Sequence, residues 1–344
     1  MGFTKEVKCV VWDLDNTIWD GTLLESDNVY LKEDIVEIIK ELDTRGILHS
    51  IASKNNFDDA IAKLEEFGIK EYFLYPEIHW DAKSKSIDNI QKNLNIGMDT
   101  IMFIDDQPFE RDEVNSQFAE VETFDAVNYK QIIQLERLNP KFITRDSQRR
   151  RKMYLEDIER KREEENYNGP EESFLKSLNM RFVISEAKEE DLKRAEELTV
   201  RTNQLNATGK TYSYDELNTF RESEMHKLYV CELNDKYGSY GKIGLALIEK
   251  NENYWYLKLL LMSCRVMSRG VGSVLMTHIM QETSREGKYL RADFKQTDRN
   301  RMMYVTYRFA NFKELSNDGN GNIIFENDLT QIQKFPPYIS VEII

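Results

Sequence analysis

Apolar runs and amphipathic helical patterns alternate along the first third of the chain. Short runs of buried type predict four strands, at residues 9–12, 47–52, 72–75 and 101–104. Between the first two, Ile35, Ile39 and Leu42 recur at helical spacing. Gly46 follows this helix where a C-terminal cap belongs. Alternation of this kind specifies an α/β fold with a parallel sheet covered by helices on both faces.

The pattern changes between residues 142 and 170, where charges of both signs are dense and aliphatic residues are scarce. This stretch predicts a solvated linking helix with ion pairs between residues four apart. Strand and helix patterns resume after Phe182, with expected strands at 227–233, 242–249, 254–262, 290–294, 322–325 and 338–343. We therefore expect a first domain at 1–140, a charged helical linker at 141–180 and a second α/β domain at 181–344.

Composition narrows the class of protein. The chain has 344 residues, of which 40% are hydrophobic, as expected for two globular domains. With 47 basic against 61 acidic residues its net charge is -14, which argues against a nucleic-acid partner. Apolar runs stay short of the roughly 18 residues that a membrane span needs, and the start lacks a signal-peptide pattern, so a cytoplasmic protein is expected.

Paired carboxylates follow the first predicted strand. Asp13 and Asp15 leave the sheet at its carboxyl edge, where open parallel sheets bind ligands. One carboxylate can attack a phosphoryl group if a divalent cation offsets the repulsion between anions, and the second can protonate the leaving oxygen. Mg²⁺ suits such oxygen ligands, and we expect it on Asp13, the Asp15 carbonyl, and Asp105 or Asp106 after the fourth strand.

Neutralising donors are expected at the same edge. Ser53 ends the second strand and can donate to a phosphoryl oxygen, while Lys83 can neutralise charge and orient the nucleophile. Lys54 and Asn55 follow Ser53 directly and are expected to bind substrate or phosphate. Taken singly, acids after strands are most often turn or helix-cap residues, so the order of these motifs carries the hypothesis.

That order resembles the haloacid dehalogenase (HAD) superfamily: Asp13 with Asp15, then Ser53, then Lys83, then the pair of aspartates after the fourth strand. The resemblance implies a Rossmannoid parallel sheet with Asp13 as nucleophile and Asp15 as general acid and base. The short spacing from Asp13 to Ser53 and from Ser53 to Lys83 leaves no room for a cap domain. The pocket should be open, with the flap at 16–30, the second domain or a protein partner as its lid.

The second domain carries a glycine turn at a predicted helix start. Arg269, Gly270 and Gly272 follow the strand at 254–262, and a helix N-terminus offers free N–H groups to a phosphate. The stretch resembles the pyrophosphate loop of GNAT-type acetyltransferases, although Met267 stands at the usual leading Gln or Arg position. The resemblance implies a GNAT-like domain that binds the phosphate of a pyrophosphate or phosphopantetheine group.

Three cysteines are too few and too widely spaced for a disulfide framework or a zinc site. Cys9 and Cys231 fall within apolar strand patterns and are expected to be packed small hydrophobes. Cys264 lies at a strand edge, beside Arg265 and close to a helix N-terminus, two features that lower a thiol pKa. Cys264 is therefore the candidate nucleophile of the second domain.

Six segments together resemble the FkbH-like family over nearly the whole chain: residues 12–21, 103–111, 201–206, 235–238, 262–266 and 297–300. The resemblance implies a Mg²⁺-dependent glyceryl transferase and phosphatase that takes 1,3-bisphosphoglycerate, removes phosphate and loads a glyceryl unit on acyl carrier protein for polyketide biosynthesis. Cys264 would carry the glyceryl group as a thioester. The residues implied to line this site are Arg201, Asn203, Asp235, Thr297 and Asn300.

Two departures from that family bear on the substrate. Gly272 stands where the family tends to have an acid, and an Arg299–Asn300 pair replaces Lys-Asn. Two other functions stay open: a phosphatase fused to an acetyl-CoA-dependent N-acetyltransferase, and a silent scaffold that holds a carrier protein. The clustered, mutually repelling acids speak against a scaffold, which has no need for them.

Overall fold

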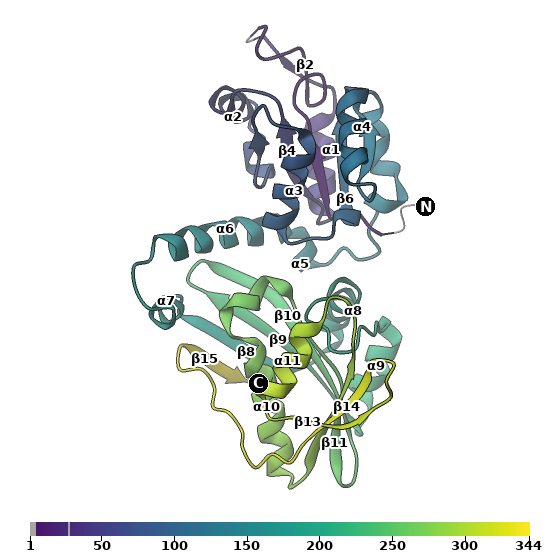
Figure 1. Ribbon diagram of the computed structural model, residues 1–344, viewed down its shortest axis with the longest axis vertical. Coiled ribbons are helices and arrows are strands. Elements are labelled where there is room, and N and C mark those ends of the chain that lie inside the picture. The colour runs from purple at the N-terminus through teal and green to yellow at the C-terminus, as the bar shows by residue number, and fades with distance from the viewer. Residues whose placement is uncertain (1–4, 27) are drawn as a thin grey trace. The chain divides into compact units, whose positions relative to one another are not determined.

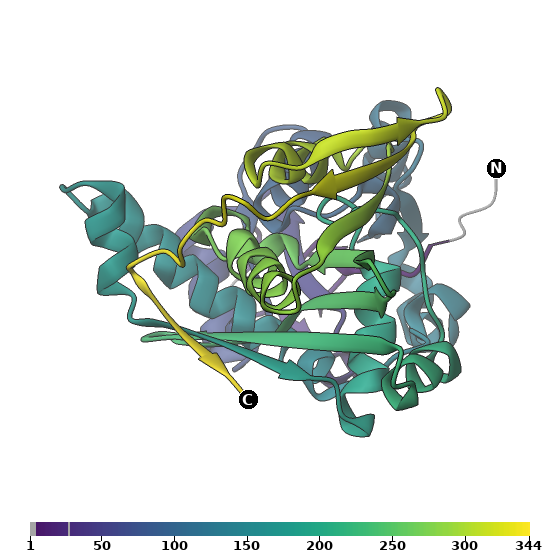
Figure 2. The same ribbon diagram turned by 90° about the horizontal axis from the view of Figure 1, so that it is seen from below.

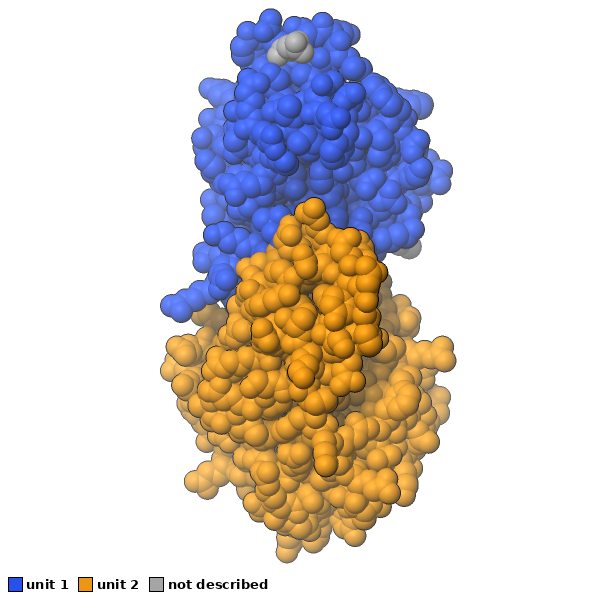
Figure 3. Space-filling view, turned by 90° about the vertical axis from the view of Figure 1, so that its left-hand side faces the viewer, with its two compact units in different colours: residues 1–155 blue, residues 156–344 orange. Residues whose placement is uncertain are grey.

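The computed structural model describes residues 5–26 and 28–344 and divides the chain into two compact units, Met1–Leu155 and Glu156–Ile344 (Figure 3). The boundary falls inside the stretch predicted as a linker. Each unit has a sheet and a hydrophobic core of its own. Among the described residues, no helix has the length and apolar character needed to cross a membrane.

The first unit is built on a five-stranded parallel sheet in the order β5-β4-β1-β6-β7 (Figure 1). Its strands are β1 (Cys9–Trp12), β4 (Leu48–Ser53), β5 (Glu77–Ile78), β6 (Ile101–Asp105) and β7 (Glu122–Asp125). Its helices are α1 (Ile35–Thr44), α2 (Phe57–Glu66), α3 (Lys83–Leu94), α4 (Pro108–Gln117) and α5 (Arg145–Gln148). The parallel sheet predicted from the alternating pattern is confirmed.

The connection after β1 holds a small hairpin of β2 (Trp19–Asp20) and β3 (Tyr30–Leu31), followed by α1. Among the described residues of this connection nothing else forms a regular element, so no cap domain is inserted, as the spacing predicted. The strand expected at 72–75 is wrong. Tyr75 adopts a left-handed conformation with φ of 48°, which breaks an extended run, and the edge strand beside β4 is β5 instead.

His49 lies in the core of this unit. Its Nδ1 accepts a hydrogen bond from Trp12 Nε1 at 3.0 Å, and its Nε2 lies 3.1 Å from the carbonyl oxygen of Ile39. Because Nδ1 accepts, Nε2 carries the proton and donates to that carbonyl. Burial lowers the pKa of His49 to about 3, so the folded protein holds a neutral ring.

This buried histidine predicts a loss of stability in acid. An unfolded histidine takes up a proton near its ordinary pKa of about 6.5. The folded pKa of His49 is lower, so the stabilisation it gives is present above that ordinary value and is lost as pH falls toward 3. Urea unfolding at pH 7 and pH 5 should show a smaller loss of unfolding free energy in His49→Gln than in the wild type. Equal losses in the two proteins would contradict the prediction.

The second unit is built on an eight-stranded mixed sheet in the order β13-β14-β12-β11-β10-β9-β8-β15. Its strands are β8 (Met180–Glu186), β9 (His226–Asp235), β10 (Gly238–Lys250), β11 (Tyr254–Met262), β12 (Tyr289–Lys295), β13 (Lys313–Asn317), β14 (Asn322–Asn327) and β15 (Ile339–Ile343). Its helices are α7 (Glu171–Ser177), α8 (Leu192–Arg201), α9 (Tyr214–Glu222), α10 (Gly272–Arg285) and α11 (Arg301–Phe309). Shorter 3₁₀ segments are η1 (Lys70–Tyr72), η2 (Met98–Thr100), η3 (Ala126–Gln134) and η4 (Glu136–Leu138) in the first unit, and η5 (Glu189–Asp191) and η6 (Cys264–Arg269) in the second. The predicted fold class, a parallel α/β domain followed by a second α/β domain, is confirmed.

Side chains alternate between the two faces of this sheet. On β9, Tyr229 and Cys231 pack in the cluster that includes α10, whereas Leu228 and Val230 pack with α8 and α9. Figure 2 shows α10 lying over one face of the sheet. The period of two along β9 therefore assigns the helices to opposite faces.

Strands β11 and β12 are parallel neighbours over only four residue pairs, from Tyr254 with Tyr289 to Leu257 with Ala292. Beyond this point an internal segment, residues 205–207, takes up the hydrogen bonds of both strands. Its backbone pairs with Leu260 and Met262 of β11 and with Lys295 of β12, at N···O distances of 2.9–3.0 Å. Residues 205–207 therefore pair with β11 on one side and with β12 on the other where these strands part.

The charged stretch at 142–170 forms α6 (Arg150–Asn166). The prediction that this helix is solvated is wrong for two of its arginines. Arg151 is buried and its Nε donates to Asp43 Oδ1 at 3.0 Å within the first unit. Arg160 is 1% exposed and makes a bidentate pair with Asp235 within the second unit. The density of charged residues predicts an exposed helix, but it does not show that Arg151 and Arg160 are buried in ion pairs.

Candidate active sites

The carboxyl edge of the first sheet gathers the acids predicted from the motif order. Asp13 follows β1, Asp105 ends the neighbouring strand β6, and Lys83 is the first residue of α3. Lys83 is 3% exposed, and its Nζ donates to Asp13 Oδ1 at 2.5 Å, Asp105 Oδ2 at 3.1 Å and the carbonyl of Ala52 at 2.7 Å. Three acceptors thus satisfy the three N–H groups of a buried ammonium.

The charges of this cluster shift one another's pKa values. Burial by itself lowers the pKa of Lys83, but Asp13 and Asp105 outweigh it and hold that pKa above its ordinary value. Burial, with the charge of Asp13, raises the pKa of Asp105 to about 6 against the opposing effect of Lys83. Burial and then Asp13 also raise the pKa of Asp106. The site is therefore short of positive charge, although it holds a lysine.

These acids fit a divalent cation. Carboxylate oxygens of Asp13, Asp105 and Asp106 lie within 4.8 Å of one another. Asp105 already accepts from Lys83 and from the backbone N–H of Gln107, whereas Oδ1 of Asp106 is buried without a hydrogen-bond partner among the described residues. A buried, unpartnered carboxylate oxygen beside two more carboxylates is the donor set that Mg²⁺ prefers. The three residues would hold it, and when bound it supplies charge neutralisation and Lewis acidity.

Metal binding should stabilise the first unit. A ligand that binds only the folded state at a concentration of 100 Kd adds about 2.7 kcal/mol to the free energy of unfolding. Adding MgCl₂ to chelator-treated protein should therefore raise the thermal unfolding midpoint, and Asp106→Asn should need a higher metal concentration for the same rise. Asp112→Asn, an exposed position on α4, is the matched control. An Asp106→Asn titration that overlays the control would remove Asp106 from the metal site.

Asp15 is held separately from the three clustered acids. Its Oδ1 accepts from Trp19 Nε1 at 2.8 Å and from the Leu23 backbone N–H at 3.1 Å, and its Oδ2 accepts from Asn55 Nδ2 at 2.9 Å. Both carboxylate oxygens are therefore engaged, which leaves the backbone carbonyl as the metal ligand expected from the sequence. The role of Trp19 was not predicted from the sequence. Its indole reaches Asp15, four residues earlier, only because the chain turns between them.

The three residues at the end of β4 differ in their roles. Ser53 is buried at the carboxyl end of the strand that neighbours β1, where a phosphoryl-binding hydroxyl was expected. Lys54 Nζ pairs with Glu110 Oε1 at 2.7 Å, and Asn55 donates to Asp15. The amide of Asn55 thus contacts Asp15 within the protein, and its expected role in substrate binding stays a prediction.

Segments predicted to line the second site do meet in the fold. The Leu205 carbonyl accepts from the backbone N–H of Met262, which brings residues 201–206 beside residues 262–266. Asn300 joins them, because its Nδ2 donates to the Asn206 carbonyl at 3.0 Å and to the Lys295 carbonyl at 2.8 Å. Arg201 lies near Glu197, with 3.5 Å between their charged atoms, and Asn203 is exposed.

Several of these polar residues make hydrogen bonds inside the protein. Asn300 is fully buried and binds backbone carbonyls, so its amide is used inside the protein. The hydroxyl of Thr297 accepts from the backbone N–H groups of Arg299 and Asn300 and shapes the turn before α11. Asp235 accepts from Arg160 and from the backbone of the β9–β10 turn.

The glycine turn before α10 is also built differently from the prediction. Arg269 is buried and its Nη1 donates to Glu164 Oε2 at 2.9 Å, so it does not extend toward a ligand. Gly270 has a φ of 68°, and a Cβ there would clash with the hydroxyl of Tyr338. Gly272, the first residue of α10, has open space where a Cβ would lie. Only the last of the three predicted phosphate-binding positions thus combines a helix N-terminus with free space.

Cys264 differs from the other two cysteines. Cys9 and Cys231 are buried, and burial raises the pKa of both thiols. Cys264 is partly exposed at the start of η6, two residues after β11 ends. Its neighbour Arg265 donates from Nη2 to the Tyr240 carbonyl at 3.0 Å. The candidate nucleophile is therefore reachable, and one N–H of the adjacent guanidinium is bound to the backbone.

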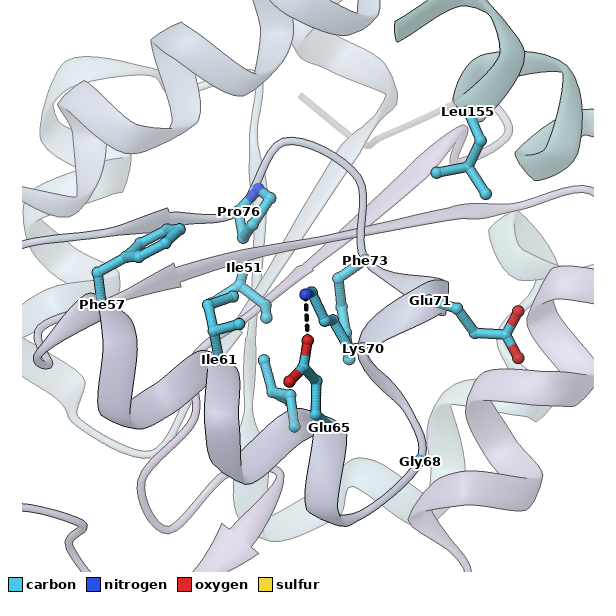
Figure 4. A pocket seen from close by; sticks show the side chains of 11 residues that line it. Ile51, Phe57, Ile61, Glu65, Gly68, Lys70, Glu71, Phe73, Pro76 and Leu155 are labelled. Carbon is cyan, nitrogen blue, oxygen red and sulfur yellow. Dashed lines mark hydrogen bonds and ion pairs between the residues drawn. The ribbon is translucent and has the colours of Figure 1, made fainter. Parts of the chain in front are cut away.

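A separate apolar cavity of about 630 Å³ lies under α2 in the first unit (Figure 4). Ile51, Phe73 and Leu155 line it, together with apolar residues of α2, and Lys70 pairs with Glu65 at its side. None of the residues that line it carries predicted chemistry. It is therefore distinct from the acidic site.

A family model matches most of the first unit of the chain. Residues 19–126 match the model of the haloacid dehalogenase-like hydrolases, a range that includes Ser53, Lys83 and the Asp105–Asp106 pair and begins after Asp13 and Asp15. Human magnesium-dependent phosphatase 1 is 27% identical over 119 residues, which cover 29% of this chain and 68% of that protein.

Solved structures match each part of the chain. The N-terminal part of protein BF1531 from Bacteroides fragilis, which contains a phosphatase domain complexed with Mg, is 30% identical with a TM-score of 0.36. That match covers 39% of this chain and 40% of the other, so the chain spans about two fifths of the protein it matches. The ribosomal-protein-S18-alanine N-acetyltransferase of Escherichia coli is 15% identical with a TM-score of 0.35, covering 45% of this chain and 97% of its own. Residues 19–126 of the first unit are therefore similar to the haloacid dehalogenase-like hydrolases.

Proposed function

We propose that the chain is a cytoplasmic, Mg²⁺-dependent enzyme that dephosphorylates 1,3-bisphosphoglycerate and transfers the glyceryl unit, through a thioester on Cys264, to acyl carrier protein in polyketide-type biosynthesis. The observation that carries the phosphatase half is the buried cluster in which Lys83 contacts both Asp13 and Asp105 beside the unpartnered oxygen of Asp106. The acyl-transfer half is supported by a reachable Cys264 beside residues 201–206.

In the phosphatase half, a carboxylate oxygen of Asp13 attacks phosphorus and the bond from phosphorus to the leaving oxygen breaks. The leaving oxygen takes a proton from Asp15. Water then attacks the aspartyl phosphate, gives its proton to Asp15, and frees Asp13 as the P–O bond to the enzyme breaks. Lys83 keeps the attacking oxygen in place and offsets charge on the transferring group.

In the acyl-transfer half, the thiolate of Cys264 attacks the carbonyl carbon of the acyl phosphate. The C–S bond forms as the C–O bond breaks, and phosphate leaves with the electron pair. The thiolate of the phosphopantetheine arm then attacks the same carbon and expels Cys264 as thiolate. An acyl phosphate is already activated, so neither step needs an added energy source.

Intact mass measurement tests this route. After incubation with 1,3-bisphosphoglycerate and MgCl₂, the wild type should carry a glyceryl or phosphoglyceryl adduct, and Cys264→Ala should carry none. Met267→Ala, an exposed change in the same 3₁₀ segment, is the control that should keep the adduct. An adduct that persists in Cys264→Ala would reject the thioester.

A second candidate is a phosphatase fused to an acetyl-CoA-dependent N-acetyltransferase. The open position at Gly272 on the N-terminus of α10 favours it, because a helix N-terminus with free space accepts a phosphate group. Acetyl transfer to an amine should survive Cys264→Ala and should need acetyl-CoA. The same protein samples thus separate the two functions.

A further inference from the structure

Hydrogen bonds from two segments of the chain hold the carboxylate of Asp15. Trp19 and Leu23 belong to the connection that follows Asp15, and both donate to its Oδ1. Asn55 belongs to the loop between β4 and α2, and its Nδ2 donates to Oδ2 of Asp15. Three N–H donors on two oxygens fix both the position and the plane of the carboxylate.

Asn55 lowers the stability of the folded protein at a position where an apolar residue would not. It is 2% exposed, and its Oδ1 is buried without a hydrogen-bond partner among the described residues. A buried, unpartnered acceptor destabilises the folded protein, and an apolar side chain of the same size would avoid this penalty. The bond from Nδ2 to Asp15 is the compensating contact, and turning the amide over would set its oxygen against the carboxylate.

We propose that Asn55, together with Trp19, is a positioning residue that holds the carboxylate of Asp15 where it exchanges a proton with the leaving oxygen. The inference rests on the proposed phosphatase function and deepens it. Asn55 does not touch the substrate in this role. It acts through Asp15, so its loss impairs proton delivery to the leaving oxygen and spares substrate binding.

The leaving group provides a test that a general disturbance of the site does not mimic. Phenolate is a poor leaving group that needs a proton in the transition state, whereas p-nitrophenolate leaves with little help. Asn55→Leu keeps the volume of the side chain and removes the donor. With MgCl₂, its kcat/KM on phenyl phosphate should fall about tenfold further than its kcat/KM on p-nitrophenyl phosphate, with KM for both changed less than about threefold.

Two further variants complete the design. Trp19→Phe removes the other side-chain donor from a different element and should give the same selective loss, which decides the matter if Asn55→Leu does not fold. Asn89 lies on α3, outside the site, and donates to Glu77. Asn89→Leu deletes this donor and should leave the ratio of the two kcat/KM values unchanged. Equal losses on the two substrates in the Asn55 and Trp19 variants would overturn the positioning role. A wild type that hydrolyses neither phosphate would overturn the proposed phosphatase itself, and the role of Asn55 with it.

Discussion

Asp13→Asn is expected to lower phosphate release from p-nitrophenyl phosphate by about a thousandfold or more. The substitution replaces the attacking oxyanion with a neutral amide of nearly the same shape, and a nucleophile has no substitute in the site. Asp15 is not expected to take over, because N–H donors from Trp19, Leu23 and Asn55 hold its carboxylate outside the cluster of Asp13, Asp105 and Asp106. A colorimetric phosphate assay with MgCl₂ measures the effect.

Two checks accompany that assay. The urea midpoint of Asp13→Asn should stay close to that of the wild type, because Lys83 keeps its bonds to Asp105 and to the Ala52 carbonyl. Asp112→Asn makes the same chemical change at an exposed site on α4 and should be fully active. If Asp13→Asn kept a tenth or more of the activity, another residue would have to be the nucleophile.

Arg160→Met is expected to give the largest loss of stability, about 3–5 kcal/mol in the second unit. Arg160 donates from Nε and Nη2 to the two oxygens of Asp235 at 2.7 and 2.9 Å, and its guanidinium lies 4.0 Å from the ring centroid of Tyr240. The side chain of Asp235 is 0% exposed, so removing its partner leaves a buried and uncompensated carboxylate.

Urea unfolding of the second unit, followed by circular dichroism, measures this loss. Arg181→Met is the matched control, since Arg181 pairs with Glu342 while their side chains are 54% and 42% exposed, and such pairs contribute little. The double variant Arg160→Met with Asp235→Asn should lose less stability than the sum of the two single changes, because it removes both charges. Additive losses would indicate that the pair is not coupled.

The acids of the first unit could be found from sequence because two simple regularities meet there. Apolar runs of four to six residues mark buried parallel strands, and the carboxyl ends of such strands share one edge of the sheet. Asp13 and Asp105 directly follow or end neighbouring strands, so their order along the chain implied their proximity. The strand expected at 72–75 failed, because the left-handed conformation of Tyr75 is not encoded in hydrophobicity.

Polar residues of the second unit show where such reasoning stops. Asn300 and Asp235 stand in motif-like segments, and each could equally face a ligand or the protein interior. The structure gives both an internal role, with Asn300 bound to the carbonyl of Asn206 and Asp235 bound to Arg160. Those contacts join positions 94 and 75 residues apart, a separation that no local pattern spans.

Short-range periodicity and strand order are readable in the amino-acid sequence, so the alternation of strands and helices, the lack of room for a cap domain and the acids at the first sheet edge could all be predicted. The partners of the polar groups became known only from the folded chain: Asn55 on Asp15, Arg160 on Asp235, and the backbone of residues 205–207 between β11 and β12. Such pairings depend on the packing of elements that are far apart in the sequence. Burial makes a hydrogen bond necessary for each polar group, but the local sequence does not show which residue supplies it.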